Sequence, residues 1–339
     1  MSKQITMGVI GCGYWGPKLV REFYASHSFD LKYVCDRDPD RLNKTKAHYP
    51  TIQVTDDCQT LFRDTGVDAI AIATPVSSHY ELAKKSLQAG KHTWVEKPLT
   101  ATSGQAEDLI ETADRNRVTL HVDHTFIYTP AVRKIKEIYE HDVLGQFYYF
   151  DSVRVNLGLF QHDVNVVWDL APHDLSILKY VVGREPKSVA ATGRCHIRCG
   201  ENLENMAYIT VNFEDHGIGH FHVNWLSPVK IRQILISGSK KMLIYNDMES
   251  VEKIKVYDAG VDIQSKDDIY HTLLQYRTGD MYSPKVENRQ ALQVECAHFF
   301  DCIVNNRRTD TSGEDGLYVV RLLEAANESI RRGGKLVEL

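Results

Sequence analysis

A histidine and two aspartates interrupt an apolar helical pattern near the middle of the chain. The stretch VVWDLAPHDLSIL, residues 166–178, otherwise resembles a buried helix, yet it contains Asp169, His173 and Asp174. A buried charge is costly unless it is paired, so these residues require an explanation. Positions i and i+4 share one face of a helix. Asp169 and His173 can therefore point at one common group, and a neutral imidazole there can act as a general base.

The start of this helix decides how His173 behaves. We expect the helix to begin near Asp169, which places Pro172 in the first turn, where N–H groups have no helical partner. His173 then lies near the positive end of the helix dipole, which favours the neutral ring. Asp174 is expected to face away and cap the helix or contact a neighbour. A core histidine held by aspartates is the alternative interpretation.

A glycine-rich turn near the N-terminus has the spacing of a dinucleotide-binding motif. GVIGCGYWG places Gly11, Gly13 and Gly16 between a predicted strand and a predicted helix, where glycine lets the backbone approach a pyrophosphate. Asp36 ends the next strand about 20 residues past Gly16, where a carboxylate accepts hydrogen bonds from an adenosine ribose. A carboxylate repels a 2′-phosphate, which favours NAD over NADP. The adjacent Arg37 leaves NADP open, because a guanidinium can pair with that phosphate or lie on the adenine face.

Two further predicted strand ends carry functional side chains. One strand ends at Thr74 and Pro75, and the next ends at Glu96, Lys97 and Pro98. An open parallel sheet binds its ligand at the carboxyl ends of its strands, so both groups are expected in the cofactor crevice. The predicted cofactor-binding residues are Gly11, Gly13, Tyr14, Trp15, Gly16, Asp36, Arg37, Thr74, Pro75, His79, Glu96 and Lys97.

The elements that must position these residues change in character near residue 124. Before it, the strands ITMGVIG, LKYVCD, VDAIAIAT, KHTWVEKP and VTLHVD alternate with amphipathic helices, which predicts a parallel, doubly wound sheet. After it, a helix from Pro130 to about Asp142 precedes GQFYYFDSVRVNLG, PKSVAATGRCHIRC, NMAYITVNF, GIGHFHVNWL, IRQILISG and KMLIYN, and two helices close the chain. Consecutive strands predict an antiparallel sheet. The expected fold is α/β, with a dinucleotide-binding domain at 1–124 and an α+β domain at 125–339.

Composition narrows the class of protein and its partners. The 339 residues carry a formal net charge of −5, which predicts neither nucleic acid nor a membrane as the main partner. Without a visible secretory signal or a run of roughly 18 apolar residues, and with seven dispersed cysteines, we expect a cytoplasmic protein with reduced thiols. Cys195, His196 and Cys199 could be metal ligands, but GRCHIRC alternates like a strand and no second ligand pair follows. No metal site is predicted.

The spacing from Thr74 to Pro98, T-P-x-x-x-H-x-x-x-A followed by A-G-K-H-x-x-x-E-K-P, resembles the glucose-fructose oxidoreductase, inositol dehydrogenase and MocA (Gfo/Idh/MocA) family of sugar and cyclitol dehydrogenases. The resemblance extends through the glycine turn, the second sheet and the closing segment SGEDGLYVVRLLEAANESIRRGGKLVEL. It implies a Rossmann domain that binds NAD, joined to an open-faced sheet domain for substrate binding and for assembly as a homodimer or homotetramer.

The same resemblance implies the catalytic residues. The lysine of E-K-P is implied to contact both the substrate hydroxyl and the cofactor, a role that falls on Lys97. The family's aspartate and histidine, four residues apart on a helix, match Asp169 and His173. Small residues often fill the two positions before that histidine, so Pro172 departs from the common pattern and leaves the start of the helix less certain.

The stretches GYWGPKLVREF, WDLAPHDLSILKYVVG and NWLSPVKIRQILISGSKKMLIYND resemble the branch of this family found with nucleotide-sugar modification. There a sugar 3-hydroxyl is oxidised to a ketone before transamination. We therefore predict NAD-dependent oxidation of a secondary hydroxyl, at C3, of a nucleotide-linked sugar, a small-molecule partner. His173 takes the hydroxyl proton, Lys97 polarises the oxygen and Asp169 orients the reacting carbon, although the sequence leaves open whether Lys97 or His173 accepts the proton.

Recognition of the nucleotide is assigned to positions in the second half. Lys230 and Arg232 alternate onto one face of a predicted strand and could meet a diphosphate, but a solvated sheet face explains them equally well. Asn156, Gln161 and Asp163, before the helix that carries His173, are expected by position alone to bind hydroxyl groups of the sugar, and with Lys230 and Arg232 they complete the predicted substrate-binding residues.

Two other functions remain open. A dehydrogenase of a free sugar, sugar phosphate or inositol would not need the nucleotide. A non-catalytic, cofactor-sensing regulator could use the same fold, but the presence of Lys97, Asp169 and His173 together argues against it.

Overall fold

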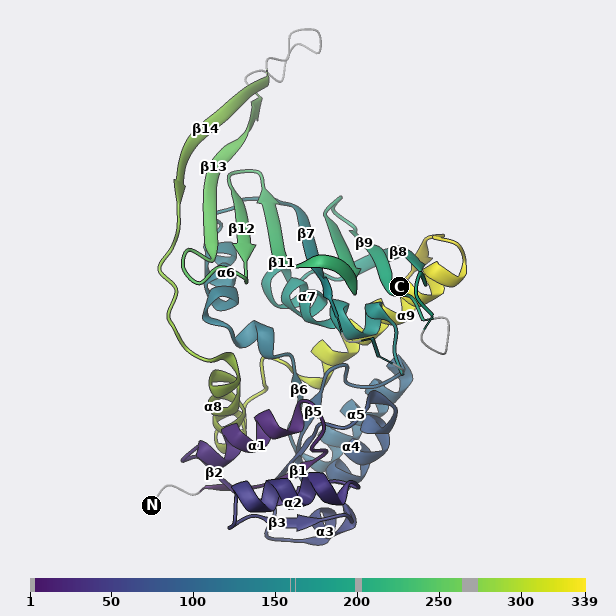
Figure 1. Ribbon diagram of the computed structural model, residues 1–339. Helices are drawn as coiled ribbons and strands as arrows, with labels where there is room; N and C mark the ends of the chain where they lie inside the picture. The colour runs from purple at the N-terminus through teal and green to yellow at the C-terminus, as the bar shows by residue number, and fades with distance from the viewer. Residues whose placement is uncertain (1–3, 159, 162, 199–202, 264–273) are drawn as a thin grey trace. The chain divides into compact units, whose positions relative to one another are not determined.

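A computed structural model describes residues 4–158, 160–161, 163–198, 203–263 and 274–339 (Figure 1). The chain packs into two compact units. The first unit contains the N-terminal part up to Tyr128 together with residues 289–321, and the second contains Thr129–Asn288 and Leu322–Leu339.

Six parallel strands form the sheet of the first unit over its described residues, in the order β3-β2-β1-β4-β5-β6. This order has a switch point next to β1, where doubly wound folds bind dinucleotides. The predicted parallel sheet is confirmed, and the short edge strand β3 is an addition to it. The strands are β1 (Ile5–Ile10), β2 (Phe29–Cys35), β3 (Gln53–Thr55), β4 (Ala69–Ile72), β5 (His92–Glu96) and β6 (Leu120–Asp123). The helices between them are α1 (Gly16–Ala25), α2 (Pro39–His48), α3 (Gln59–Arg63), α4 (His79–Gln88) and α5 (Ser103–Asn116), with 3-10 turns η1 (Val76–Ser78) and η2 (Thr125–Tyr128).

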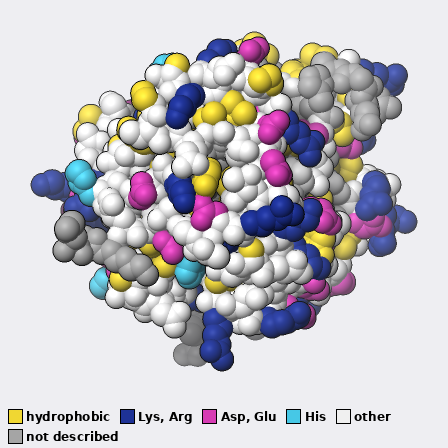
Figure 2. Space-filling view, turned by 90° about the horizontal axis from the view of Figure 1, so that it is seen from below, with side chains coloured by type: hydrophobic (Ala, Val, Ile, Leu, Met, Phe, Trp, Pro, Cys, Tyr) yellow, Lys and Arg dark blue, Asp and Glu magenta, His cyan; other side chains and the backbone are white. Residues whose placement is uncertain are grey.

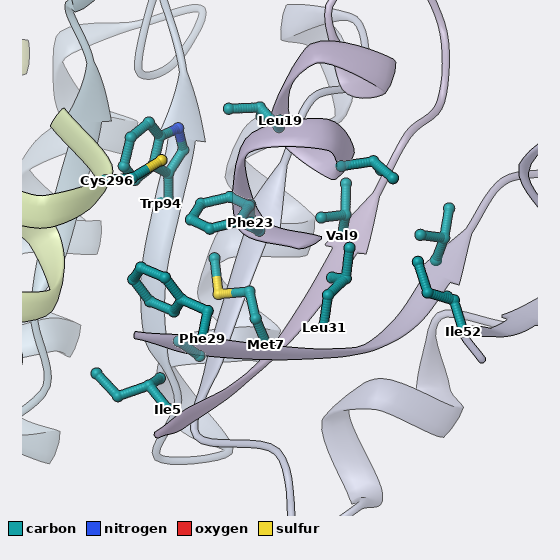
Figure 3. Close-up of a cluster of buried hydrophobic side chains, with 14 of the residues drawn as sticks. Ile5, Met7, Val9, Leu19, Phe23, Phe29, Leu31, Ile52, Trp94 and Cys296 are labelled. Atoms are coloured by element: carbon teal, nitrogen blue, oxygen red, sulfur yellow. The ribbon is translucent and has the colours of Figure 1, made fainter. Parts of the chain in front are cut away.

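Helix α8 (Ala291–Val304) comes from the far end of the chain but packs in the first unit. Its buried side chains Leu292, Cys296 and Phe299 join the apolar cluster that Figure 3 shows around Phe29 and Trp94. The ring centroid of Phe299 lies 5.4 Å from that of Trp94 and 6.4 Å from that of Phe29.

This packing changes the expected division of the chain. The sequence suggested two continuous ranges, 1–124 and 125–339, whereas residues 289–321 pack with the first unit. The reason is that the apolar stripe of α8 is buried against strands and a helix that are more than 190 positions away, and no local pattern shows this.

Nine strands form the sheet of the second unit over the residues that the structure describes, in the order β14-β13-β12-β11-β7-β10-β9-β8-β15. Neighbours are antiparallel except β7 and β10, which run parallel. The predicted, mainly antiparallel sheet is thus confirmed. The strands are β7 (Phe147–Leu157), β8 (Pro186–Arg194), β9 (Met206–Phe213), β10 (Ile218–Asn224), β11 (Leu226–Gly238), β12 (Met242–Asn246), β13 (Ile254–Ile263), β14 (Leu274–Tyr282) and β15 (Val337–Glu338). The helices of this unit are α6 (Pro130–Glu140), α7 (Val166–Val182) and the part of α9 (Gly313–Arg331) that follows Arg321.

Strand β8 ends earlier than predicted. It stops at Arg194, so the expectation that GRCHIRC continues the strand is wrong. The side chain of Asn205 accepts hydrogen bonds from the backbone N–H groups of His196 and Ile197, at 2.7 and 2.9 Å, and these bonds take the place of a β ladder. Cys199 lies outside the described residues.

Helix α7 is fixed to the sheet by a buried ion pair. Arg154 of β7 donates from Nε and Nη2 to the two carboxylate oxygens of Asp174, at 2.9 and 2.7 Å. Both side chains are almost completely buried, at 4% and 3% exposed, so each charge compensates the other. Asp174 therefore contacts a neighbouring strand, as one of its two predicted roles required, and it has a structural function.

The surface is of mixed charge where it can be seen. On the face shown in Figure 2, Lys and Arg side chains are interspersed with Asp and Glu. Among the described residues, no helix has the length and apolar character that a membrane crossing requires.

We expect Phe299→Ala to destabilise the first unit. Removing a buried phenylalanine typically costs about 3–5 kcal/mol of unfolding free energy, and Phe299 packs on Trp94 and Phe29. Phe300→Ala, one residue along the same helix and only partly buried, is the matched control and should cost less. Urea unfolding followed by tryptophan fluorescence measures both. A Phe299→Ala transition at the same urea concentration as that of the unchanged protein would contradict a stabilising role for α8.

Candidate active site

The glycine turn after β1 is tight at two positions and open at a third. Gly11 has φ +96°, and a Cβ atom there would lie 2.6 Å from the carbonyl oxygen of Ala73. A Cβ atom at Gly16 would lie 2.0 Å from the carbonyl oxygen of Gly11. At Gly13 the nearest atom to such a Cβ is Nη1 of Arg41, at 3.6 Å. The turn therefore leaves room at Gly13, beside the N-terminus of α1, where a pyrophosphate fits.

Asp36 connects this turn to the end of β2. Its Oδ2 accepts a hydrogen bond from the backbone N–H of Cys12 at 2.6 Å, and its Oδ1 accepts one from Asp38 at 2.9 Å. Each carboxylate oxygen keeps a further lone pair for a ribose hydroxyl. The guanidinium near Asp36 is that of Arg41, with Nη1 at 3.6 Å, whereas the predicted Arg37 is exposed. Arg41 was not among the residues predicted from the sequence, although its position in the first turn after the N-cap Asp38 was a usable signal.

Trp15 and Tyr14 of the glycine turn have different environments. Trp15 donates from Nε1 to Oδ2 of Asp123, at 2.8 Å, and Trp94 donates to the same oxygen at 3.2 Å. Burial raises the pKa of Asp123, and these hydrogen bonds oppose that rise. Tyr14 is 79% exposed and lies under the ammonium group of Lys18. Asp123, which the sequence analysis did not select, thus holds the turn against the end of β6.

His79 joins the ends of β4 and β5. Its Nδ1 lies 2.9 Å from the carbonyl oxygen of Pro98, and its Nε2 lies 2.8 Å from that of Thr74. Burial lowers the pKa of His79, so the neutral ring donates to one carbonyl at a time. Because both ring nitrogens face backbone carbonyls, the structure places His79 as a support for the two strand ends, and Thr74 and the E-K-P segment are held together by it.

Lys97 and His124 follow neighbouring strands. Glu96 of β5 pairs in register with Asp123 of β6, and Lys97 and His124 are the next residues of each strand. Lys97 is partly exposed, whereas His124 is 1% exposed and its ring nitrogens have no hydrogen-bond partner among the described residues. Burial, together with the charge of Lys97, lowers the pKa of His124 to about 3. The cationic Lys97 and the neutral imidazole of His124 therefore occupy neighbouring positions at the carboxyl edge of the sheet.

Helix α7 begins earlier than the sequence analysis expected. Asn165 caps it by accepting a hydrogen bond from the backbone N–H of Trp168 at 3.2 Å, and the first helical residue is Val166. The expectation of a start near Asp169 is therefore wrong. Pro172 lies inside the helix, and His173 lies beyond the first turn, where the dipole effect has faded.

Asp169 and His173 keep the relation that matters for chemistry. They lie four residues apart on α7 and are both partly exposed, whereas Asp174 and most of the apolar residues of the helix are buried. Oδ2 of Asp169 accepts a hydrogen bond from the indole Nε1 of Trp225 at 2.9 Å. The pair therefore belongs to an accessible face of the second unit, and Lys97 belongs to the first unit.

The predicted substrate-binding residues belong to several elements of the second unit. Asn156 lies near the end of β7, Gln161 and Asp163 lie before α7, and Lys230 is exposed on β11. Nη1 of Arg232 lies 3.3 Å from Oδ2 of Asp247, so the two side chains form an ion pair. The pairing of β11 with β7 is irregular between Leu226 and Ile231, so strand alternation does not place Lys230 on the same face as Arg232. Among the described residues, no group of three His, Cys, Asp or Glu side chains could hold a metal ion.

A doubly wound sheet, a glycine turn open at Gly13 and an acid at the end of β2 define a dinucleotide-dependent oxidoreductase of the two-domain type. Comparison with known families agrees. The N-terminal model of the Gfo/Idh/MocA oxidoreductases, described as an NAD-binding Rossmann fold, matches residues 5–124, and their C-terminal alpha/beta domain model matches residues 161–339. The chain belongs to the Gfo/Idh/MocA oxidoreductase family, which confirms the predicted family, enzyme class, fold and NAD cofactor.

Individual relatives differ in substrate. The chain is 31% identical to UDP-N-acetylglucosamine 3-dehydrogenase of Acidithiobacillus ferrooxidans over 60% of this chain and 63% of that protein. It is 23% identical to the NAD-dependent scyllo-inositol 2-dehydrogenase of Bacillus subtilis over 98% of this chain and 96% of that protein. A crystal structure of GenD2 from gentamicin A biosynthesis, in complex with NAD, is similar with a TM-score of 0.84 and 21% identity, over 100% of this chain and 97% of that one.

We expect Asp36→Ala to weaken NADH binding about 10- to 100-fold, the effect of losing about one charged hydrogen bond. The preference for NADH over NADPH should also fall, because the Asp36 carboxylate no longer repels the 2′-phosphate and Arg41 keeps only its ion pair with Asp38. Fluorescence titration with both cofactors measures the dissociation constants. Asp36→Asn removes the charge but keeps an oxygen that can accept the hydrogen bond from the backbone N–H of Cys12. Asp40→Asn, which changes an exposed residue of α2, is the control. Equal affinities for NADH and NADPH in the unchanged protein would contradict this role.

Proposed function

We propose that the protein oxidises a secondary hydroxyl, at C3, of a nucleotide-linked sugar to a ketone. The observation that carries the proposal is the partly exposed pair of Asp169 and His173 on α7, in a chain whose other unit has Lys97 at the carboxyl end of a dinucleotide-binding sheet. These residues offer the three kinds of group that oxidation of a hydroxyl needs, namely a base, an orienting carboxylate and a cation.

The residues divide the reaction as follows. The glycine turn and Asp36 would hold NAD, which when bound would supply the acceptor for the hydride of the reacting carbon. His173 takes the hydroxyl proton as that hydride leaves, and the ammonium group of Lys97 stabilises negative charge on the oxygen. Asp169, whose carboxylate accepts a hydrogen bond from the indole of Trp225, orients the sugar ring. The buried ion pair between Arg154 and Asp174 keeps α7, and with it both catalytic side chains, at a constant position on its sheet.

Support for a nucleotide-linked substrate comes from one relative and one cation. The relative named UDP-N-acetylglucosamine 3-dehydrogenase shares 31% identity with part of this chain. Lys230 is exposed and can meet a diphosphate, whereas the ion pair of Arg232 with Asp247 must open or be shared for Arg232 to do so. This pairing favours the second candidate, a free sugar or inositol, which would not need an anion site and agrees with the inositol dehydrogenase relative.

His173→Asn should lower turnover by about 10²- to 10⁴-fold, the usual contribution of general acid-base catalysis, and leave NADH binding unchanged. Lys97→Ala should reduce turnover at least as much. His141→Asn, which removes an exposed histidine of the second unit, is the control. The measurements are kcat from NADH absorbance and the dissociation constant of NADH by fluorescence. Near-normal turnover of His173→Asn would instead support the core-histidine interpretation and leave the proton transfer to Lys97.

The substrate class is tested with UDP- and dTDP-hexoses beside free hexoses, hexose phosphates and inositols. We expect NADH formation with a nucleotide-linked hexose, and a raised KM for it in Lys230→Ala and Arg232→Ala, because contacts with the diphosphate hold the remote end of the substrate. Lys187→Ala, which removes an exposed lysine on β8, is the control. A ketone trap is included, since oxidation releases a proton and the equilibrium near neutral pH favours the alcohol. Equal activity with a free sugar or inositol would establish the second candidate, and any substrate-dependent NADH formation excludes a non-catalytic regulator.

A further inference from the structure

The indole of Trp225 is the partner of a predicted catalytic carboxylate. Trp225 lies between β10 and β11 and is 1% exposed. Its Nε1 donates to Oδ2 of Asp169 at 2.9 Å. A hydrogen bond to a charged acceptor is stronger than one between neutral groups. The bond therefore acts directly on how the Asp169 carboxylate is oriented.

The indole is itself held by its backbone and by its neighbours. The backbone N–H of Trp225 donates to the carbonyl of Asn205 at 2.9 Å, and its own carbonyl accepts from Gly158 at 3.1 Å. The aromatic ring packs on Phe160, with centroids 5.4 Å apart. A Cβ atom on Gly158 would lie 2.8 Å from Cδ1 of the indole. The ring therefore has little room to move relative to the strands that carry it.

This rigidity has a consequence for Asp169. A partly exposed aspartate can adopt several side-chain rotamers, and the entropy of that freedom must be lost before the carboxylate can orient a substrate. A donor that cannot move selects one rotamer and engages Oδ2, so that Oδ1 stays in a defined direction. A support of this kind, behind the residue that contacts the substrate, is what a precise catalytic geometry requires.

We propose that Trp225 is a positioning residue that holds Asp169 in its productive orientation. This inference rests on the proposed function, because it takes Asp169 as a residue that contacts the substrate. It adds Trp225 to the residues that the sequence predicted for the site, and it assigns the role to one N–H group.

Trp225→Phe tests that group, because it keeps a buried aromatic ring and removes the N–H donor. We expect kcat to fall about 10- to 100-fold, the range for one charged hydrogen bond lost in the transition state, with an unchanged dissociation constant for NADH. The matched control is Trp168→Phe, which removes another buried indole, on helix α7 next to Asp169. Among the described residues the Trp168 N–H has no hydrogen-bond acceptor, so kcat should stay within about twofold. An equal loss in both variants would overturn the proposal in favour of a packing effect.

A double-mutant cycle with Asp169→Asn shows whether Trp225 acts through Asp169. In the Asp169→Asn background, Trp225→Phe should change kcat by less than about threefold. The same loss in both backgrounds would overturn the proposal. The proposed role of Asp169 is judged separately by Asp169→Asn alone, because full turnover of that variant would refute the catalytic assignment whatever Trp225→Phe does.

Gly158→Ala provides an independent perturbation if Trp225→Phe does not fold. The added methyl group meets Cδ1 of the indole and must displace the ring from Asp169. We expect a similar fall in kcat with an unchanged affinity for NADH. Full turnover of a folded Gly158→Ala variant with a displaced indole, detected by its altered tryptophan fluorescence, would overturn the proposal.

Discussion

The parallel hydrogen-bonded register of the first sheet determines where the chemistry of this protein can occur. Parallel strands place their carboxyl ends at one edge, and the register of Glu96 with Asp123 carries Lys97 and His124 to that edge together. The glycine turn after β1 is held there by Asp36, through the N–H of Cys12. The strand pairing therefore sets the position of the cofactor site, and the side chains at the strand ends determine what the site binds.

Buried polar groups in the two units are compensated in different ways. In the second unit, Asp174 is neutralised by a bidentate pair with Arg154, which fixes the helix that carries His173. In the first unit, Asp123 receives two indole N–H groups, and burial raises its pKa. The ring of His124 has neither an ion pair nor a hydrogen-bond partner among the described residues, and its lowered pKa keeps it neutral. In each unit these buried groups are thus either neutral or held by hydrogen bonds.

Features that depend on residues close together in the sequence could be predicted, whereas features that depend on distant residues could not. The turn at Gly11 was readable from the sequence, because a left-handed φ and contact with Ala73 are demands that glycine meets locally. The pairing of Asp169 with His173 was readable for the same reason, since helix geometry sets it. The start of α7 was not, because Asn165 caps it three residues earlier than expected. Nor was the end of β8, where Asn205 reaches the backbone from a later segment.

The sequence by itself determined the family, the parallel and mainly antiparallel sheets, the NAD cofactor and the spacing of the residues proposed for catalysis, because these depend on local periodicity and on motifs read along the chain. Only the tertiary structure decided that α8 belongs to the first unit, that Asp174 pairs with Arg154, and that Trp225 donates a hydrogen bond to Asp169. Each of these depends on contacts between segments that are far apart in sequence, where burial and hydrogen-bond geometry select the partner. The substrate and the oligomeric state stay predictions, since a substrate is chosen by side chains from several such segments at once.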